Sequence, residues 1–225
     1  KSRLRDRALV GGVDARWQTG MLELERLFLQ GAGFEARAAG ALEERLTWGV
    51  QVSDPSALVP GSSGRFNANG WVRYAKERLS GAATVRGSRL ALSGFQAAAV
   101  EADAAMENEE AQRLDARVFL KGLVCGPVRV DTAQVKSTGT AGDHAIRVLF
   151  ESGEGRMEAT LRGGYGKAAW KGALETLRGT GAAGPWGLQA PASVTISAAR
   201  SSVGPLLIAG EGGESFEFSM DVSGD

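Results

Sequence analysis

Apolar and polar residues alternate along most of this chain, and that alternation limits the fold more than any other feature of the sequence. It is clearest in six segments, each with an apolar residue or glycine at every second position: 46–52, 66–72, 114–120, 146–150, 157–161 and 216–222. Because successive side chains of a β-strand point to opposite faces of its sheet, each segment would present one apolar and one polar face. The pattern predicts an antiparallel sheet with one face in contact with water.

The stretch 97–117 is the place where a helix competes with a strand. Alanine, glutamate and glutamine, which have good helix propensity, are abundant there. Val100, Met106 and Leu114, however, form a poor apolar stripe at helical spacing. We therefore expect strands in this stretch and keep a helix as the alternative.

A loose repeat indicates how the strands connect. It places a short alternating strand between two glycines, followed by a charged tip and a returning apolar run, at 33–40, 64–70 and 155–163. Each unit is typical of a β-hairpin and cannot bury its apolar face alone, so we expect successive units to stack edge to edge in one sheet. The most loop-like stretch, 54–65, has room for a single helical turn. No linker divides the chain, and we expect one domain over residues 1–225.

The charge balance argues against several classes of partner. Lysine and arginine total 26, and aspartate and glutamate also total 26, so the chain has no net charge at pH 7. Without a net positive field, we do not expect it to bind nucleic acid or an anionic membrane surface. Apolar residues make up 43% of the 225 residues, which is enough for a sizeable buried core.

A glycine-rich segment has the spelling of a dinucleotide-binding fingerprint. Residues 179–184 read Gly-Thr-Gly-Ala-Ala-Gly, a match to G-x-G-x-x-G. That motif works between a buried parallel strand and a helix whose first N–H groups hold the pyrophosphate. Here strand-like runs lie on both sides, one with Trp170 and one with Trp186, and no Asp or Glu occurs from 176 to 210. We expect a turn between two strands and no nucleotide cofactor.

Metal-binding and nucleophilic chemistry find little support. His144 is the only histidine and Cys125 the only cysteine, so no pair has the ligand spacing of a zinc site. No G-x-S-x-G elbow is present, and we expect no catalytic residue, no metal, no cofactor and no enzyme activity. We interpret His144 as the first residue of a strand, hydrogen-bonded to a neighbour, and Cys125 as an unreactive filler among apolar residues.

Two phrases of the chain resemble the TamB family, the translocation and assembly module subunits of the AsmA-like superfamily. The first, 54–71, has an Asp, a short apolar turn, a Pro and two glycines opening a strand. The second, 139–196, has Gly-Thr, His144, alternating strands, Trp170-x-Gly-x-Leu and Trp186-x-Leu-x-x-Pro, in that order. Both are similar to the C-terminal part of that family, although Pro55 stands where the family more often has an apolar residue.

The resemblance implies an all-β fold, in which a long curved antiparallel sheet forms a U-shaped groove, or β-taco, with an apolar concave face. Residues 1–225 would be a single segment of that groove, excised from a longer protein. The family is similar to bridge-like lipid-transfer proteins. By that resemblance, the parent protein would be anchored in the inner membrane of a diderm bacterium and would span the periplasm. Its partners would be phospholipid acyl chains, carried toward the outer membrane, and an Omp85-type barrel, TamA or BamA. The alternative is a scaffold without lipid, whose strand edges engage such a barrel or its client proteins during insertion and secretion.

The residues support such a groove in one respect. A one-sided sheet of this length leaves a large apolar face to cover, and an acyl chain of about 16 carbons gains on the order of 12 kcal/mol on leaving water. Shielding that chain needs an apolar lining and no catalytic group. The candidate lining residues alternate on the strands or belong to the tryptophan phrases: Leu46, Trp48, Val50, Val52, Ile146, Val148, Phe150, Met157, Leu161, Trp170 and Leu188.

Overall fold

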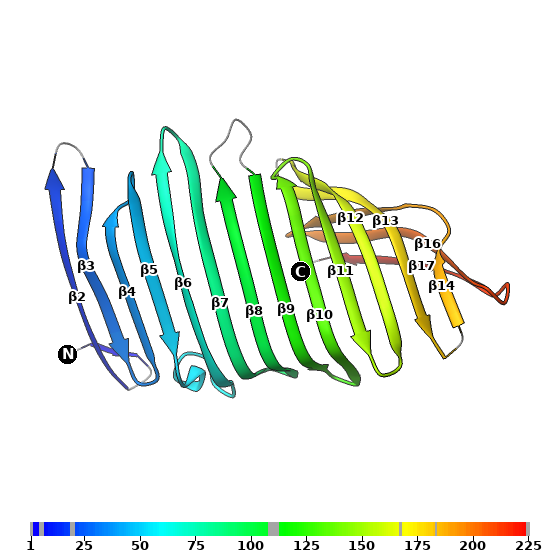
Figure 1. Cartoon of the computed structure of the whole chain (residues 1–225), viewed down its shortest axis with the longest axis horizontal. Coiled ribbons are helices and arrows are strands. Elements are labelled where there is room, and N and C mark those ends of the chain that lie inside the picture. Colours follow the sequence, from blue (N-terminus) through cyan, green and yellow to red (C-terminus); the bar gives the residue numbers. More distant parts are fainter. Residues whose placement is uncertain are drawn as a thin grey trace. The chain divides into compact units, whose positions relative to one another are not determined.

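The computed structural model describes residues 2–4, 7–18, 21–107, 113–166, 168–182 and 184–223, and most of them lie in β-strands (Figure 1). The strands are β1 (Ser2–Leu4), β2 (Arg7–Gln18), β3 (Met21–Gly31), β4 (Phe34–Ala41), β5 (Arg45–Val52), β6 (Ser63–Ala75), β7 (Arg78–Leu92), β8 (Phe95–Glu107), β9 (Arg113–Cys125), β10 (Val128–Thr140), β11 (His144–Ser152), β12 (Gly155–Gly166), β13 (Ala169–Gly181), β14 (Gly184–Leu188), β15 (Ala192–Ser197), β16 (Arg200–Gly210) and β17 (Ser215–Ser223). One short 3₁₀ helix, η1 (Pro55–Ala57), lies between β5 and β6. Within these ranges, no helix has the length and apolar character needed to cross a membrane.

The contacts between residues divide the chain into two compact units, and each is described by itself. Unit 1 comprises Lys1–Gln112 and Val118–Arg129, and unit 2 comprises Arg113–Arg117 and Val130–Asp225. Strands β1 to β8 therefore belong to unit 1 and β11 to β17 to unit 2, while β9 and β10 contribute residues to both.

In unit 1 the strands form an antiparallel meander (Figure 1, blue to green). Each strand from β1 to β7 pairs with the next one in the sequence. The register is continuous from β4 to β5 and from β5 to β6, and it shifts once in each of the pairs β2–β3, β3–β4 and β6–β7. Because directly opposed residues point to the same side of a sheet, this register decides which side chains share a face.

The connection between β5 and β6 contains the η1 turn. The Asp54 carboxylate accepts a hydrogen bond from the backbone N–H of Ser56 (3.1 Å), and Pro55 takes a first helical position that needs no N–H donor. The N–H of Asp54 donates to the carbonyl of Gly33 (3.1 Å), which ties η1 to the turn between β3 and β4. The helical turn predicted within 54–65 is confirmed, and its geometry accommodates the proline.

In unit 2, two short strands share one position in the sheet. β11, β12 and β13 pair in sequence, and β13 then pairs with both β14 and β15. β16 pairs with the same two strands from the other side, and β17 follows β16. Pro191, which has no backbone N–H, lies in the gap between β14 and β15. β14 and β15 are therefore two halves of one strand that is interrupted at 189–191.

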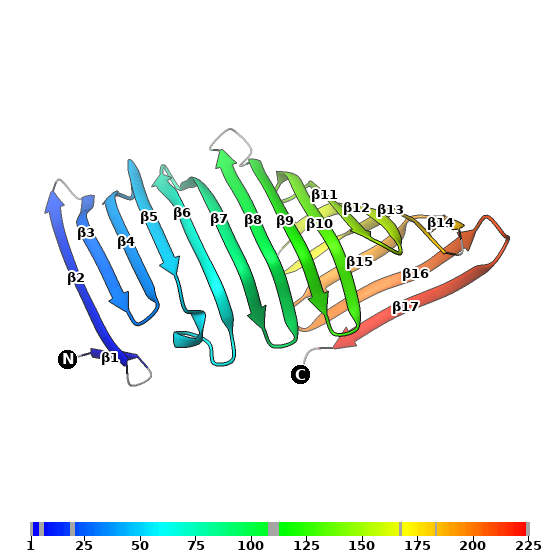
Figure 2. The ribbon, with the colours of Figure 1, turned by 60° about the horizontal axis from the view of Figure 1, so that its bottom comes forward.

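The sheet of unit 2 curls around a core on its apolar face. Seven buried residues from β12, β13, β15 and β16 form this cluster: Ala159, Trp170, Leu174, Ala192, Val194, Leu206 and Ile208. Ile146 and Val148 of β11 pack against the same cluster as Val203 of β16, although β12, β13 and the β14/β15 position separate their strands in the sheet. Figure 1 shows β16 and β17 passing behind β11 to β13, and Figure 2 shows β15 to β17 from another side, below β11 to β13. Register shifts at Thr160/Leu161 and Val203/Leu206 mark irregularities of the kind that bend strands.

The predicted fold is confirmed. The chain is all-β and antiparallel, and all six alternating segments lie inside strands, namely β5, β6, β9, β11, β12 and β17. β8 ends at Glu107 and β9 begins at Arg113, so the helix kept as an alternative for 97–117 is wrong for the described residues; 108–112 lie outside them.

The segment 179–184 is a hairpin, as predicted. Gly181 of β13 pairs with Gly184 of β14 across the turn. Gly184 has a φ of +89°, a conformation that side-chain-bearing residues rarely adopt. The glycines serve the turn, and strands rather than a helix stand on both sides.

Candidate functional site

The apolar face of unit 1 is continuous across six strands, β3 to β8. Four rows of directly opposed residues cross these strands, and every member is apolar or glycine. In strand order the rows are Leu24, Gly40, Leu46, Val72, Gly81 and Met106; Leu27, Ala38, Trp48, Gly70, Ala83 and Ala104; Leu29, Ala36, Val50, Ala68, Val85 and Ala102; and Gly31, Phe34, Val52, Phe66, Gly87 and Val100. The four lining residues predicted on β5 all lie on this face, one in each row.

The opposite face of unit 1 carries the polar rows, together with Trp71 in the row through Thr47. The row through Gln51 consists of Gln30, Glu35, Gln51, Asn67, Arg86 and Glu101. Its strand neighbours Val50, Ala68 and Val85 are on the apolar side, so a single step along each strand changes the chemistry of the face. The alternation seen in the sequence is thus maintained across strand after strand.

The apolar face of unit 1 is largely uncovered by unit 1 itself. Val13 extends the Trp48 row onto β2 and is 62% exposed. In the described part of unit 1, the buried apolar residues are Val52, Pro55, Ala57 and Ala97. Among the members of the four rows, unit 1 therefore buries Val52 and leaves the others half-buried.

The remaining predicted lining residues lie in unit 2, where most of them join the core. Trp170 is 4% exposed at the core cluster, and Ile146, Val148, Leu161 and Leu188 pack against that cluster. Phe150 and Met157 are directly opposed on β11 and β12 and are half-buried. The structure thus separates the eleven predicted residues into four on an open face and seven on the face that curls inward.

Three tryptophans lie over glycines of the sheet. A Cβ added to Gly70 would come within 2.8 Å of Trp48 Cζ2, and one added to Gly179 within 2.3 Å of Trp186 Cζ2. Trp170 lies over Gly163 in the same way, at 2.8 Å. Each ring occupies the space that a side chain at the glycine would need. In both units, glycine is therefore required at these positions so that the indole can pack flat on the sheet.

His144 begins β11, as predicted, and its ring holds Trp170. The indole Nε1–H of Trp170 donates to His144 Nε2 (2.8 Å), and His144 Nδ1 lies 3.0 Å from the carbonyl oxygen of Thr140. Because an indole nitrogen only donates, Nε2 is the unprotonated acceptor and Nδ1 carries the proton. The interpretation of His144 as a hydrogen-bonded residue at a strand start is confirmed.

The comparison with protein families decides what kind of chain this is. The family model described as "TamB, N-terminal domain" matches residues 9–204, most of the chain. The chain belongs to the TamB family. Membership places it among cell-envelope proteins of diderm bacteria. Searches of curated proteins and of solved structures found no match.

The expected position within TamB is wrong. We predicted the C-terminal part, and the matching family model describes the N-terminal domain. Glycine-bounded alternating strands recur at 33–40, 64–70 and 155–163. A pattern that recurs along the chain in this way does not locate a segment within the family.

Unit 2 of this TamB chain carries a buried carboxylate on its polar face. Glu158 is 7% exposed and pairs with Arg178 (2.9 Å) and Arg147. Hydrogen bonds from Arg178 and then Arg147 hold the pKa of Glu158 below its ordinary value. Arg162 pairs with Asp143 (3.0 Å), and this contact likewise lowers the pKa of Asp143. Glu158 is thus a buried carboxylate neutralised by two arginines, whereas the pair of Arg162 and Asp143 is exposed.

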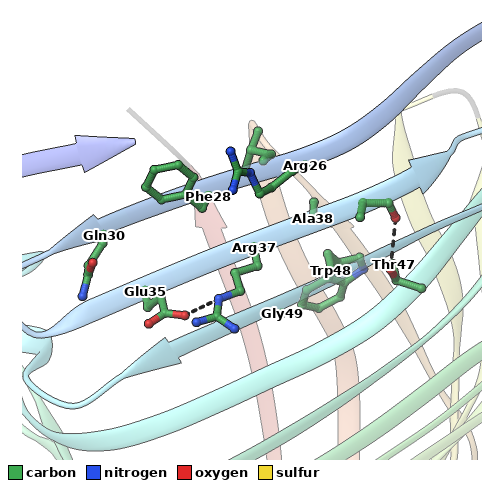
Figure 3. Close-up of a pocket in the computed structure, with 11 residues that line it drawn as sticks. Arg26, Phe28, Gln30, Glu35, Arg37, Ala38, Thr47, Trp48 and Gly49 are labelled. Carbon is green, nitrogen blue, oxygen red and sulfur yellow. Dashed lines mark hydrogen bonds and ion pairs between the residues drawn. The ribbon is translucent and has the colours of Figure 1, made fainter. Parts of the chain in front are cut away.

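A pocket of about 590 Å³ lies over β3, β4 and β5, mainly on the polar face of unit 1 (Figure 3). Arg37 and Gly49 are directly opposed there, and the missing side chain of Gly49 leaves a hollow beside the guanidinium. Arg37 pairs with Glu35, and Arg26 pairs with Asp14 (2.7 Å). The charges are thus balanced locally, and Leu27, Ala38 and Trp48 of one apolar row also belong to the pocket lining. The alternating pattern did not predict this pocket, because the main sequence feature that marks it is a single glycine, Gly49.

Cys125 is exposed at the end of β9, so the expectation that it fills space among apolar residues is wrong, while its lack of reactivity stays a prediction. Among the described residues, no three His, Cys, Asp or Glu side chains come together in a way that could hold a metal ion.

Proposed function

We propose that this chain is a segment of a TamB bridge, which shields phospholipid acyl chains on an apolar face while lipid crosses the periplasm toward the outer membrane. The observation that carries the proposal is the apolar face of unit 1, with four rows of apolar residues or glycine across β3 to β8. The rows run across the strands, and so they follow the long direction of a growing sheet.

The dimensions suit an acyl chain. Neighbouring strands lie about 4.8 Å apart, so the rows extend for about 24 Å between β3 and β8. One leaflet of a bilayer has a hydrocarbon thickness of about 15 Å, half of the roughly 30 Å core. The two middle rows, through Trp48 and Val50, have Ala or Gly at most of their other positions, and Phe34, Phe66, Leu46 and Val72 stand in the outer rows. An extended chain lying along the middle rows would be flanked by larger side chains.

The test compares adjacent residues on opposite faces. A photo-crosslinking amino acid replaces Val50, Ala68 or Val85 on the apolar face, and Gln51, Asn67 or Arg86 on the polar face, in the full-length protein in cells. These two sets are matched controls, because each pair occupies the same strand one residue apart. We expect phospholipid adducts from the first set and few from the second. Equal labelling of both sets would contradict the proposal.

The rest of the functional picture is part of the proposal. The parent protein would be anchored in the inner membrane and would meet an Omp85-type outer-membrane barrel, TamA or BamA. Shielding an acyl chain requires apolar surface and no bond chemistry, so the chain would act without catalysis or cofactor. Its balanced charge, 26 basic and 26 acidic residues, favours an apolar ligand over nucleic acid.

One observation favours a second candidate, a scaffold that engages a barrel or its client through a strand edge. All nine residues of β17 are exposed, and Phe216, Phe218, Met220 and Val222 alternate along it. Within the described part of unit 2, β17 takes its hydrogen bonds from β16 alone, so its other edge could add a strand. Purified protein that carries no lipid by mass spectrometry, yet binds a barrel edge-strand peptide, would favour this candidate over lipid shielding.

A further inference from the structure

We infer that His144 is a positioning residue: it holds the Trp170 indole across the interior of unit 2 and thereby keeps that interior closed to acyl chains. The inference rests on the proposed function for the identity of the excluded ligand. The hydrogen bond between His144 and Trp170, and its effect on the core of unit 2, can be tested without lipid.

The interior of unit 2 is already filled by its own side chains. The seven residues of the core cluster are each 9% exposed or less. By contrast, Leu46, Trp48 and Val50 on the apolar face of unit 1 are only half-buried. An acyl chain that lies on the face of unit 1 therefore has no equivalent place in unit 2 until the core side chains move.

Trp170 is the largest member of this core, and its seat is built for an indole. Cβ atoms added at Gly163 and Gly172 would lie 2.8 Å from Trp170 Cζ2 and 2.6 Å from Cη2. The two glycines thus leave a flat surface on β12 and β13, which the ring covers. Apolar packing of this kind is not directional, and it does not by itself fix the rotation of the ring.

The hydrogen bond supplies that direction. Trp170 Nε1–H donates to His144 Nε2 at 2.8 Å, while His144 Nδ1–H donates to Thr140 O at 3.0 Å. Thr140 is itself held, because its N–H donates to the carbonyl oxygen of Asp143 (2.8 Å). The two hydrogen bonds of His144, to Thr140 and from Trp170, connect the turn before β11 to the core.

The bond requires a neutral imidazole. An imidazolium carries a proton on both nitrogens and has no lone pair to accept the indole N–H. The charged groups beside His144 are Asp143, on the same turn, and Arg162, on β12, and they pair with each other (3.0 Å). Lys171 follows Trp170 on β13 and so points to the opposite face. Protonation of His144 would therefore break the bond to Trp170.

Two substitutions separate the hydrogen bond from the packing. His144→Gln keeps an acceptor near the position of Nε2 and does not titrate, whereas His144→Phe keeps a ring and removes the acceptor. In the 225-residue chain, the ¹⁵N–¹H signal of the Trp170 indole is assigned by its loss in Trp170→Phe. We expect its hydrogen exchange to be about tenfold faster in His144→Phe, and close to wild type in His144→Gln.

The pH dependence gives a signature that a purely structural role would not produce. Indole exchange, corrected for the intrinsic effect of pH, should accelerate in the wild type as His144 is protonated, but should follow no such transition in His144→Gln. Equal exchange in wild type and His144→Phe at neutral pH would overturn the inference. So would a transition of the same size in His144→Gln.

Lipid access is measured by photo-crosslinking from Leu177, which packs against the core cluster, with Val50 of unit 1 as the reference. In the full-length protein we expect adducts at Val50 in every variant, and adducts at Leu177 that rise severalfold in His144→Phe but not in His144→Gln. Adducts at Val50 with an unchanged yield at Leu177 would overturn the positioning role alone. Loss of adducts at Val50 in all variants, including wild type, would contradict the proposed function, and with it the exclusion of lipid from unit 2.

Discussion

The two units share the same alternating pattern, but the apolar face is open in unit 1 and forms a closed core in unit 2. In unit 1 three strand pairs contain a register shift, and the apolar rows form a face that unit 1 leaves largely uncovered. In unit 2 the sheet contains two register shifts and a strand split into β14 and β15, and its apolar residues meet in one core. The comparison teaches that alternation determines which side of a sheet is apolar, but does not by itself determine whether that side closes, since register shifts occur in both units.

The largest expected difference between the units comes from removing a tryptophan in each. Trp170→Ala should lower the free energy of unfolding by about 3–5 kcal/mol, because it empties part of a closed core. Trp48→Ala should cost about 1–2 kcal/mol, because its ring is only half-buried on an open face. Urea unfolding followed by circular dichroism measures both. Equal losses would show that the two faces do not differ in closure.

Both units have a tryptophan that lies over a glycine, and substitution of that glycine should have a similar effect in each unit. Gly163→Ala would bring a Cβ to 2.3 Å from the carbonyl oxygen of Lys171, and Gly70→Ala to 2.3 Å from that of Ala82. Each substitution should destabilise the chain by about 1–3 kcal/mol, because backbone and an indole must both shift.

Gly49→Ala is the matched control for these two variants. The atom nearest to its added Cβ is 3.9 Å away, so the substitution should be neutral or stabilise the chain by about 0.5 kcal/mol. Circular dichroism in urea again provides the measurement. A destabilised control would mean that strand glycines matter for flexibility, and not as seats for tryptophan.

Much of this architecture could be predicted from period two alone. Residues such as Val50 and Val148 lie on apolar faces as the alternation indicates, and the turn at 179–184 follows from the strands on either side. The strand β3 (Met21–Gly31) did not stand out, because its register shifts between Leu24 and Leu27 and the alternation changes phase there. A register shift of this kind interrupts the strict alternation along a strand, so the sequence pattern no longer indicates the strand clearly.

The interior of unit 2 could not be predicted in the same way. His144 and Trp170 are 26 residues apart and lie on strands separated by β12, so their contact depends on register and on the curl of the sheet. Glu158 has the sequence context of any exposed residue on a polar face, yet two arginines cover it. Such contacts are set by three strands at once, and a pattern along one strand does not contain them.

The smallest expected effect separates the units by pH. Because the pKa of Glu158 is lowered in the folded state, its contribution is fully present above the ordinary value of 4.5 and is lost as the pH falls through the lowered value. Glu158→Gln should therefore unfold at lower urea than wild type at neutral pH, and the difference should vanish in acid. Asp14→Asn removes an exposed pair with Arg26 in unit 1 and should cost only about 0–1 kcal/mol. A difference between wild type and Glu158→Gln that persists unchanged into acid would contradict the assignment, because it would then come from the shape of the side chain and not from its charge.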